Sequence, residues 1–241
     1  KMTFRKNAEE MQTSSKSVVD RLVDNIIEAI ITKEFRPGDK IPTESELSEM
    51  MGMSRNSVRE AVKILVAYGI LEVRRAEGTF VVSNYNDKML NPMVYGIILS
   101  GRDQAGLIET RRIIDTGVLS IVIEKVTDKE MGELEDALEA LKRELFREKP
   151  SAERIFDADV AFHQSIMRLT QNDILNGIGI FVDRITKLSR IKTTENIIAM
   201  HRLEELYEMH REIISVLRRK ELSKVSPVIA DHYKYWIQTE R

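Results

Sequence analysis

Residues 43–71 constrain the fold more than any other part of the chain. Thr43 and Glu46 are spaced as a capping box, which predicts that a helix begins here, and Gly52 predicts where it ends. Ser54 then predicts the N-cap of a second helix. The apolar residues of this second helix recur at helical spacing: Val58, Ala61, Val62, Leu65 and Val66. Two helices joined by so short a turn are typical of a helix-turn-helix motif.

The second helix also has a cationic, hydrogen-bonding side, which consists of Arg55, Asn56, Arg59 and Lys63. Arginine can bond guanine and asparagine can bond adenine in the major groove of DNA, so these residue types suit a recognition helix. For this stretch alone, the alternative is an ordinary helical hairpin with a solvated charged face.

The flanking residues favour DNA binding over that alternative. Residues 71–75 and 79–82 are rich in β-forming types, and a turn at Ala76, Glu77 and Gly78 joins them, which predicts the hairpin, or wing, of a winged helix. Upstream, residues 18–32 carry paired apolar residues at helical spacing and end before Arg36-Pro37-Gly38, which predicts a first amphipathic helix.

The motifs PG-x-K-x-P-x-E, SR-x-x-VREA and GTFV begin at residues 37, 54 and 78. With them the chain resembles the DNA-binding domain of GntR-family bacterial transcription regulators. The resemblance implies DNA contacts by Arg55 and Arg59 and a wing tip at the minor groove. The full expected set of DNA-binding residues is Thr43, Arg55, Asn56, Arg59, Lys63, Arg75 and Gly78. Two departures from the family pattern are Ser45, where arginine is frequent, and Ala76, where glycine is frequent.

Composition limits the classes of protein to which this chain can belong. The 241 residues suffice for one or two domains with a sizeable core. No apolar run approaches ~20 residues, so no membrane-spanning helix is expected. Residues 1–12 lack the apolar core of a signal peptide, and the chain has no cysteine, so a cytoplasmic protein without disulfides or thiolate metal sites is expected. Because the net charge is only −2, positive charge for DNA must be local.

The chain divides into four predicted segments. Residues 1–13 are expected to be a flexible tail and residues 14–82 the winged helix-turn-helix, with Ser14 and Ser15 as the cap of its first helix. Residues 83–95 are polar, include a proline and are expected to be a linker. From residue 96 to 241 helical periodicity predicts an all-α bundle of about six helices: 103–126, 128–147, 151–170, 172–192, 198–219 and 221–239. The predicted fold class is therefore mainly α.

Polar residues interrupt the apolar stripes of four of these helices. Asp159 and His163 follow Phe156 at helical spacing, and His210 and His232 occupy equivalent inward positions on the fifth and sixth helices. Three imidazoles and one carboxylate suit a divalent transition metal such as Zn, Ni or Mn. Each histidine alone would more often be a hydrogen-bonded core residue. Arg111 also lies on an apolar stripe, where a guanidinium needs an anionic partner.

A second resemblance covers residues 105–235. This part of the chain is similar to the ligand-binding domain of the FadR-type branch of GntR regulators. The matching features are E-x-R-x-x-x-(E/D) starting at Glu109, D-x-x-F-H starting at Asp159, and the later His210 and His232. The six-helix count is similar to the shorter, VanR-like group. The resemblance implies that Asp159, His163, His210 and His232 hold the metal and that Arg111 binds a small carboxylate effector. Asp115, where the family often has glutamate, is the alternative partner of Arg111.

These features together predict a homodimeric transcription regulator that binds palindromic operator DNA and responds to a small organic carboxylate at the metal. An enzyme, such as a metal-dependent hydrolase or lyase, is the alternative, because a metal with open positions can activate water. A purely structural metal without an effector is a third possibility. No inward carboxylate free to act as a general base is evident in the sequence, so the chain is not expected to be an enzyme.

Overall fold

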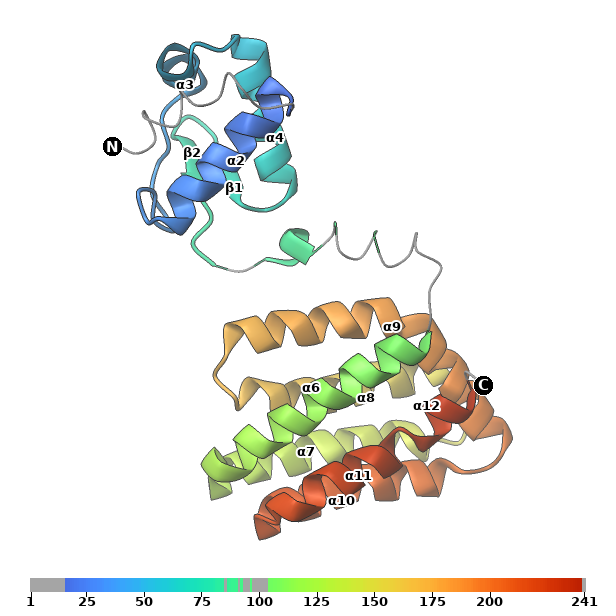
Figure 1. The fold of residues 1–241 in the computed structure, drawn as a ribbon. Helices are drawn as coiled ribbons and strands as arrows, with labels where there is room; N and C mark the ends of the chain where they lie inside the picture. The colour runs from blue at the N-terminus through green and yellow to red at the C-terminus, as the bar shows by residue number, and fades with distance from the viewer. Residues whose placement is uncertain (1–15, 85, 91, 93–95, 97–103, 240–241) are drawn as a thin grey trace. The chain divides into compact units, whose positions relative to one another are not determined.

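The computed structural model describes residues 16–84, 86–90, 92, 96 and 104–239. The chain divides into two compact units, Lys1–Tyr95 and Gly96–Arg241, whose elements are labelled in Figure 1. The predicted tail, residues 1–13, lies outside the described residues, as do residues 85, 91 and 93–95 of the predicted linker.

The first unit contains α2 (Val18–Ile31), α3 (Glu44–Met51) and α4 (Arg55–Ala67). Thr43 and Glu46 form the predicted capping box, and Gly52 ends α3 with a φ of 61°. Ser54 caps α4 by accepting a hydrogen bond from the backbone N–H of Ser57. The cap of α2 is Ser17, which accepts a hydrogen bond from the N–H of Asp20, so the prediction of a cap at Ser14 and Ser15 was wrong.

The wing consists of β1 (Leu71–Arg74) and β2 (Gly78–Val81), paired antiparallel with Leu71 opposite Val81. At its turn Ala76 has a φ of 65°, a left-handed conformation that favours glycine. The apolar sides of α2, α3, α4 and both strands enclose one core, formed by Leu22, Val23, Ile26, Ala29, Ile41, Leu47, Val58, Ala61, Val62, Leu65, Leu71 and Val81. The winged helix-turn-helix predicted from the sequence is confirmed.

The second unit is a helical bundle, also as predicted. Its elements are α6 (Gln104–Lys125), α7 (Asp128–Leu145), α8 (Ala152–Arg168), α9 (Asp173–Ala199), α10 (Leu203–Arg219), the 3-10 turn η3 (Leu222–Lys224), α11 (Val225–His232) and α12 (Lys234–Thr239). Thr127 caps α7 with a capping box, and the side chain of Asn172 caps α9. Among the described residues, none of the helices combines the length and the apolar composition needed to cross a membrane.

Several helix boundaries differ from the prediction; α10, for example, begins at Leu203, five residues later than expected. α9 continues past residue 192, because the hydroxyls of Thr193 and Thr194 bond carbonyls one turn back in the same helix and so do not interrupt it. The predicted last helix is divided at Tyr233, between α11 and α12. Tertiary contacts accompany this break: the Tyr233 hydroxyl bonds Asp115, and the Trp236 indole bonds Ser189.

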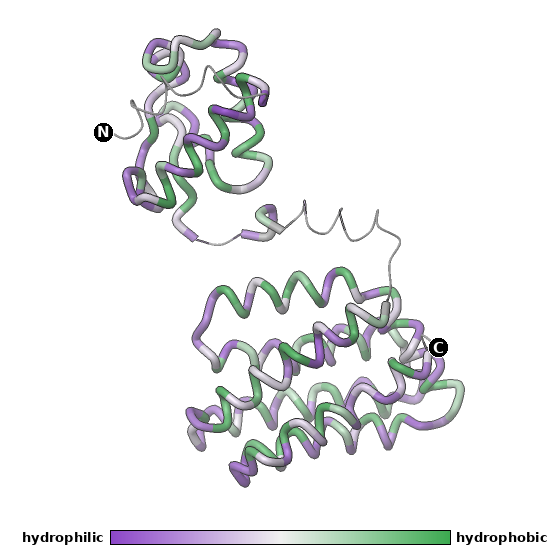
Figure 2. The backbone as a smooth tube through the Cα atoms, viewed as in Figure 1, coloured by the Kyte–Doolittle hydropathy of each residue, from purple (hydrophilic) through white to green (hydrophobic). Residues whose placement is uncertain are grey.

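The bundle has two buried apolar clusters with a polar layer between them, and the alternation of apolar and polar residues along the helices is visible in Figure 2. Along α8, Asp159 lies between Ile155 of one cluster and Phe162 of the other. Along α10, His210 lies between Met209 of one cluster and Ile213 of the other. The candidate site therefore forms where the two apolar clusters meet.

Candidate metal centre

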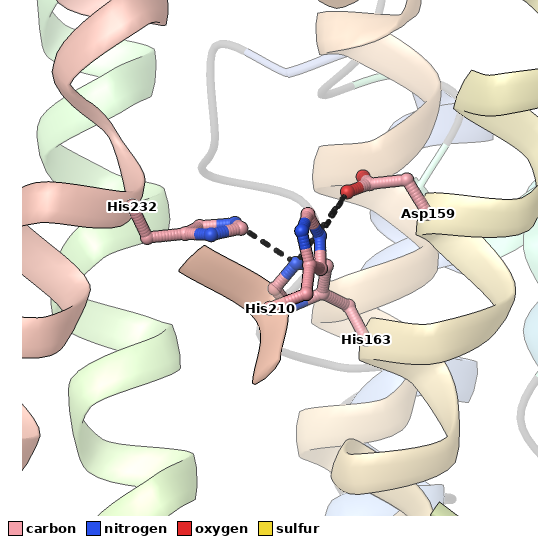
Figure 3. Close-up of side chains that lie close together, drawn as sticks. All are labelled: Asp159, His163, His210 and His232. Atoms are coloured by element: carbon pink, nitrogen blue, oxygen red, sulfur yellow. Dashed lines mark hydrogen bonds and ion pairs between the residues drawn. The ribbon is translucent and has the colours of Figure 1, made fainter. Parts of the chain in front are cut away.

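The four predicted ligands converge on one point of the bundle. Asp159 and His163 lie one turn apart on α8, His210 lies on α10, and His232 is the last residue of α11. One ligand atom from each lies within 4.8 Å of the ligand atoms of the other three. Figure 3 shows His232 approaching from the side opposite α8 and its two ligands.

Hydrogen bonds orient the imidazoles. The Nδ1 of His210 donates to the carbonyl of Leu206 at 2.7 Å, which directs its Nε2 to Asp159 Oδ1, also at 2.7 Å. The Nε2 atoms of His163 and His232 face each other at 3.0 Å. The ring of Phe162 packs edge-on against both His163 and His210, and this contact keeps one side of the site apolar.

The protonation states also suit a metal. Burial lowers the pKa of His163 to about 4, despite the opposing charges of Asp159 and Asp115. Burial also lowers the pKa of His232, and the neighbouring histidines lower it further. Burial alone would raise the pKa of Asp159, but the charge of Arg190 brings it well below its usual range. Neutral imidazoles beside an ionised carboxylate are the forms that bind metal ions.

The donor set fits a divalent transition ion. Three imidazole nitrogens and one carboxylate oxygen are ligands that Zn, Ni and Mn all accept. Between two neutral imidazoles whose Nε2 atoms are 3.0 Å apart, only one nitrogen can donate, so lone pairs concentrate at this point. The Nδ1 of His232 is buried and has no hydrogen-bond partner within the described structure. Residue types and orientation therefore agree with the predicted metal site.

Arg111, predicted to bind an effector, already has two anionic partners. Its Nε donates to both carboxylate oxygens of Asp115 at 3.1 Å, and its Nη1 donates to Asp183 Oδ1 at 2.5 Å. Its side chain is only 2% exposed. The alternative considered from the sequence, a pair with Asp115, is thus present and is extended by Asp183.

Asp183 and Arg190 on α9 were not identified from the sequence. Arg190 bonds Asp183 Oδ1 at 2.8 Å through Nη1 and bonds the metal-ligand candidate Asp159 through Nη2. Gln164 also donates to Asp183, at 3.1 Å. A sequence signal did exist, because Asp183, Arg190 and Ile197 recur at seven-residue spacing and so share a face of α9.

A cavity of about 60 Å³ is lined by three of the four ligand candidates. Asp159, His163 and His232 lie at its polar end beside Arg190, with Thr193 and Thr194 nearby. Apolar walls are contributed by Ile155, Phe156, Ile197, Leu206 and Trp236. Arg111 is not among the residues that line it.

The predicted DNA-binding residues of α4 share an exposed face. Arg55, Asn56, Arg59 and Lys63 are all exposed, and Arg59 donates to the side-chain oxygen of Asn56 at 3.2 Å. Within the described residues of this unit, nothing covers these side chains, so they are available to a partner.

The other predicted DNA contacts lie on the wing and at the start of α3. Arg75 is exposed at the wing turn, whereas Arg74 pairs with Glu72 and packs over the ring of Phe80. Gly78 is partly exposed at the start of β2. Thr43 is exposed, but its hydroxyl takes part in the capping box.

Comparison with known proteins identifies the family. Residues 18–81 match the model for bacterial regulatory proteins of the gntR family, and residues 106–235 match the FCD domain. The protein belongs to the GntR family of bacterial regulators. Its FCD domain places it in the FadR-type branch, as the sequence motifs predicted.

Several characterised proteins are similar to this regulator. The HTH-type transcriptional regulator LutR of Bacillus subtilis is 28% identical over 76% of this chain and 83% of its own length. The galactonate operon transcriptional repressor of Escherichia coli is 25% identical over 70% of this chain and 73% of its own length. The solved structure of a GntR protein from Streptococcus agalactiae has a TM-score of 0.58 and 23% identity, and covers 90% of this chain and 98% of that one. This last similarity supports the fold.

Proposed function

We propose that this regulator binds operator DNA through its winged helix and that a small organic carboxylate, held at a divalent metal in the FCD domain, modulates this binding. The observation that carries the proposal is the convergence of Asp159, His163, His210 and His232 at one end of a cavity lined by Arg190. When bound, the ion would supply a positive charge and open coordination positions for an oxygen of the effector.

Arg190 suits the effector better than Arg111 does. Arg111 is enclosed by Asp115 and Asp183 and lies outside the cavity lining, whereas Arg190 lies in that lining. A guanidinium has five N–H donors, and Arg190 uses Nη1 for Asp183 and Nη2 for Asp159, which leaves further donors for a carboxylate. We therefore assign the predicted effector-binding role to Arg190 in place of Arg111.

The buried charges indicate which acids would bind. Arg111 and Arg190 face three carboxylates, those of Asp115, Asp159 and Asp183. A divalent ion held by neutral imidazoles would turn the excess of one negative charge into an excess of one positive charge. A monocarboxylate would neutralise this excess, whereas a dicarboxylate would bury an unpaired negative charge. One relative is named for a galactonate operon, and galactonate is a monocarboxylate.

The proposal includes two-fold pairing. One winged helix contacts a half-site, and two related copies are the usual way to recognise a palindrome. We therefore expect a homodimer on DNA, working in the cytoplasm where bacterial DNA lies. Light scattering of the protein with operator DNA tests this, and a monomer at micromolar concentration would contradict it.

The carboxylates around the site favour a regulator over the alternative of a hydrolase or lyase. A metal-dependent hydrolase needs a carboxylate or similar base free to take a proton from water. In the described part of the bundle, Asp115, Asp159 and Asp183 all bond arginine side chains. The relatives are likewise named as transcriptional regulators.

Metal analysis and a thermal-shift screen test the proposal. Protein purified without chelator should contain close to one equivalent of a divalent metal per chain, and His163→Ala should lower that content sharply because one ligand is lost. Small monocarboxylic acids should raise the melting temperature of the metal-loaded protein, and chelator should abolish the effect. Metal content near zero, or stabilisation by acids that survives complete metal removal, would refute the proposed site.

A further inference from the structure

Asp115 on α6 lies on the outer side of a metal-ligand candidate. Its Oδ2 is 3.8 Å from Nδ1 of His163, whereas Nε2 of the same ring faces His232 and Asp159. The two nitrogens of this imidazole therefore face different groups: Nε2 faces the other ligand candidates, and Nδ1 faces the carboxylate of Asp115. A carboxylate on the outer nitrogen of a metal-binding histidine favours the tautomer whose lone pair faces the metal.

Asp115 is itself held firmly. Arg111, one turn earlier on α6, donates through Nε to both of its oxygens, and Tyr233 donates its hydroxyl to Oδ2 at 2.6 Å. Burial would raise the pKa of Asp115, but the charge of Arg111 and the hydrogen bond from Tyr233 lower it, so the carboxylate stays ionised. The group beside His163 is thus a fixed anion with little freedom to turn away.

Tyr233 links Asp115 to a second ligand. It directly follows His232, at the break between α11 and α12, so its bond to Asp115 ties this end of α11 to α6. The Tyr233 ring also packs against the ring of His232, with centroids 5.4 Å apart. Asp115 therefore lies 3.8 Å from Nδ1 of His163 and restrains His232 through the neighbouring tyrosine.

We propose that Asp115 is a positioning residue of the metal centre, which sets the tautomer of His163 through Nδ1 and the placement of His232 through Tyr233. This inference rests on the proposed metal-dependent function. With this role for Asp115, α6 belongs to the metal site, although α6 supplies no ligand. The competing view is that Asp115 serves only as the counter-ion of Arg111.

The test compares Asp115→Asn and Tyr233→Phe with the parent in full-length protein. Tyr207→Phe is the matched control: it removes a phenolic hydroxyl three residues from His210, where the ring packs near Lys142 and Phe146, away from Asp115. The Zn²⁺ dissociation constant is measured by competition with a chromophoric chelator. Nitrogen-15 NMR of the metal-free protein gives the tautomer of His163, and thermal unfolding shows whether each variant is folded.

Asp115→Asn should weaken Zn²⁺ binding about 10- to 100-fold, the usual cost of losing such a partner, and should shift the His163 proton away from Nδ1. Tyr233→Phe should weaken binding by a smaller factor of at least about threefold, and Tyr207→Phe should match the parent. If Asp115→Asn does not fold, the contrast between the two tyrosine variants decides the question.

Parental affinity or a parental His163 tautomer in a folded Asp115→Asn protein would overturn this inference and leave the proposed function intact. Equal Zn²⁺ affinity of Tyr233→Phe and the parent would likewise overturn it. A parent protein that binds no Zn²⁺ would overturn the proposed function as well, so the two failures are distinguishable.

Discussion

Replacing Arg111 with methionine tests whether this arginine stabilises the fold or binds the effector. Methionine keeps most of the aliphatic volume and removes the guanidinium. The change leaves Asp115 and Asp183, which are only 5% and 6% exposed, without the cation that both of them contact. Arg190 still bonds Asp183, but the other cation is gone.

The expected cost follows from these contacts. Breaking a buried ion pair by removing one partner costs about 3–5 kcal/mol, because an uncompensated charge remains buried. For a unit of this size each kcal/mol corresponds to about 2–4 °C, so the melting temperature of the helical unit should fall by about 6–20 °C. The loss should be present without metal and without effector, since none of these contacts involves either.

Trp236 makes the measurement specific to the helical unit. It is the only tryptophan of the chain, and it is buried with its indole N–H bonded to Ser189. Urea unfolding followed by its fluorescence, with chelator present, therefore reports on this unit. Arg112→Met is the matched control, because Arg112 is the next residue and has no ion pair in the described structure; it should stay within about 0.5 kcal/mol of the parent.

A stability of Arg111→Met within about 1 kcal/mol of the parent would refute this structural role. So would a variant that keeps its stability but loses affinity for the carboxylate effector, because that pattern belongs to a ligand-binding arginine.

Three further predictions follow from other parts of the structure. If Arg59 contacts a base, Arg59→Ala should cost about 1–3 kcal/mol of operator affinity and relax specificity at one base pair. If Arg59 contacts a phosphate, the substitution should lower affinity equally for all sequences and make its salt dependence shallower. Unchanged affinity after substitution of both Arg55 and Arg59 would contradict the assignment of this helix face. Ala76→Gly should stabilise the winged helix by about 1 kcal/mol, because glycine adopts the left-handed backbone conformation of this position (φ 65°) without the steric strain that alanine has there. A lower stability, measured by thermal unfolding with circular dichroism, would contradict this prediction. The pKa of His163 is lowered to about 4 in the folded protein, so as the pH falls the unfolded chain binds a proton first. The stability of the metal-free protein should therefore decline from about pH 6.5 toward pH 4, by up to about 3 kcal/mol from this group. The variant His163→Gln should show a smaller decline.

Local sequence patterns were enough to predict most helices and the candidate metal ligands of this protein. A capping box needs only residues three positions apart, so Thr43 with Glu46 marks a helix start that the structure confirms. Asp159 and His163 share a helix face through i,i+4 spacing, which holds wherever the helix packs. Apolar periodicity likewise placed His210 and His232 inward before any packing was known.

Tertiary structure decided how the buried charges are paired. Arg111 and Asp115 are one turn apart, but Asp183 lies 72 residues further along the chain and Arg190 further still. Only the packing of α6 and α8 against α9 brings these side chains together. Helical periodicity shows that a side chain points inward, but it does not show which helix that side chain meets. The choice of Arg190 over Arg111 as the effector-binding candidate therefore came from the structure. The break at Tyr233 has the same origin, because a buried tyrosine takes the position from which its hydroxyl can reach an acceptor, here the distant Asp115.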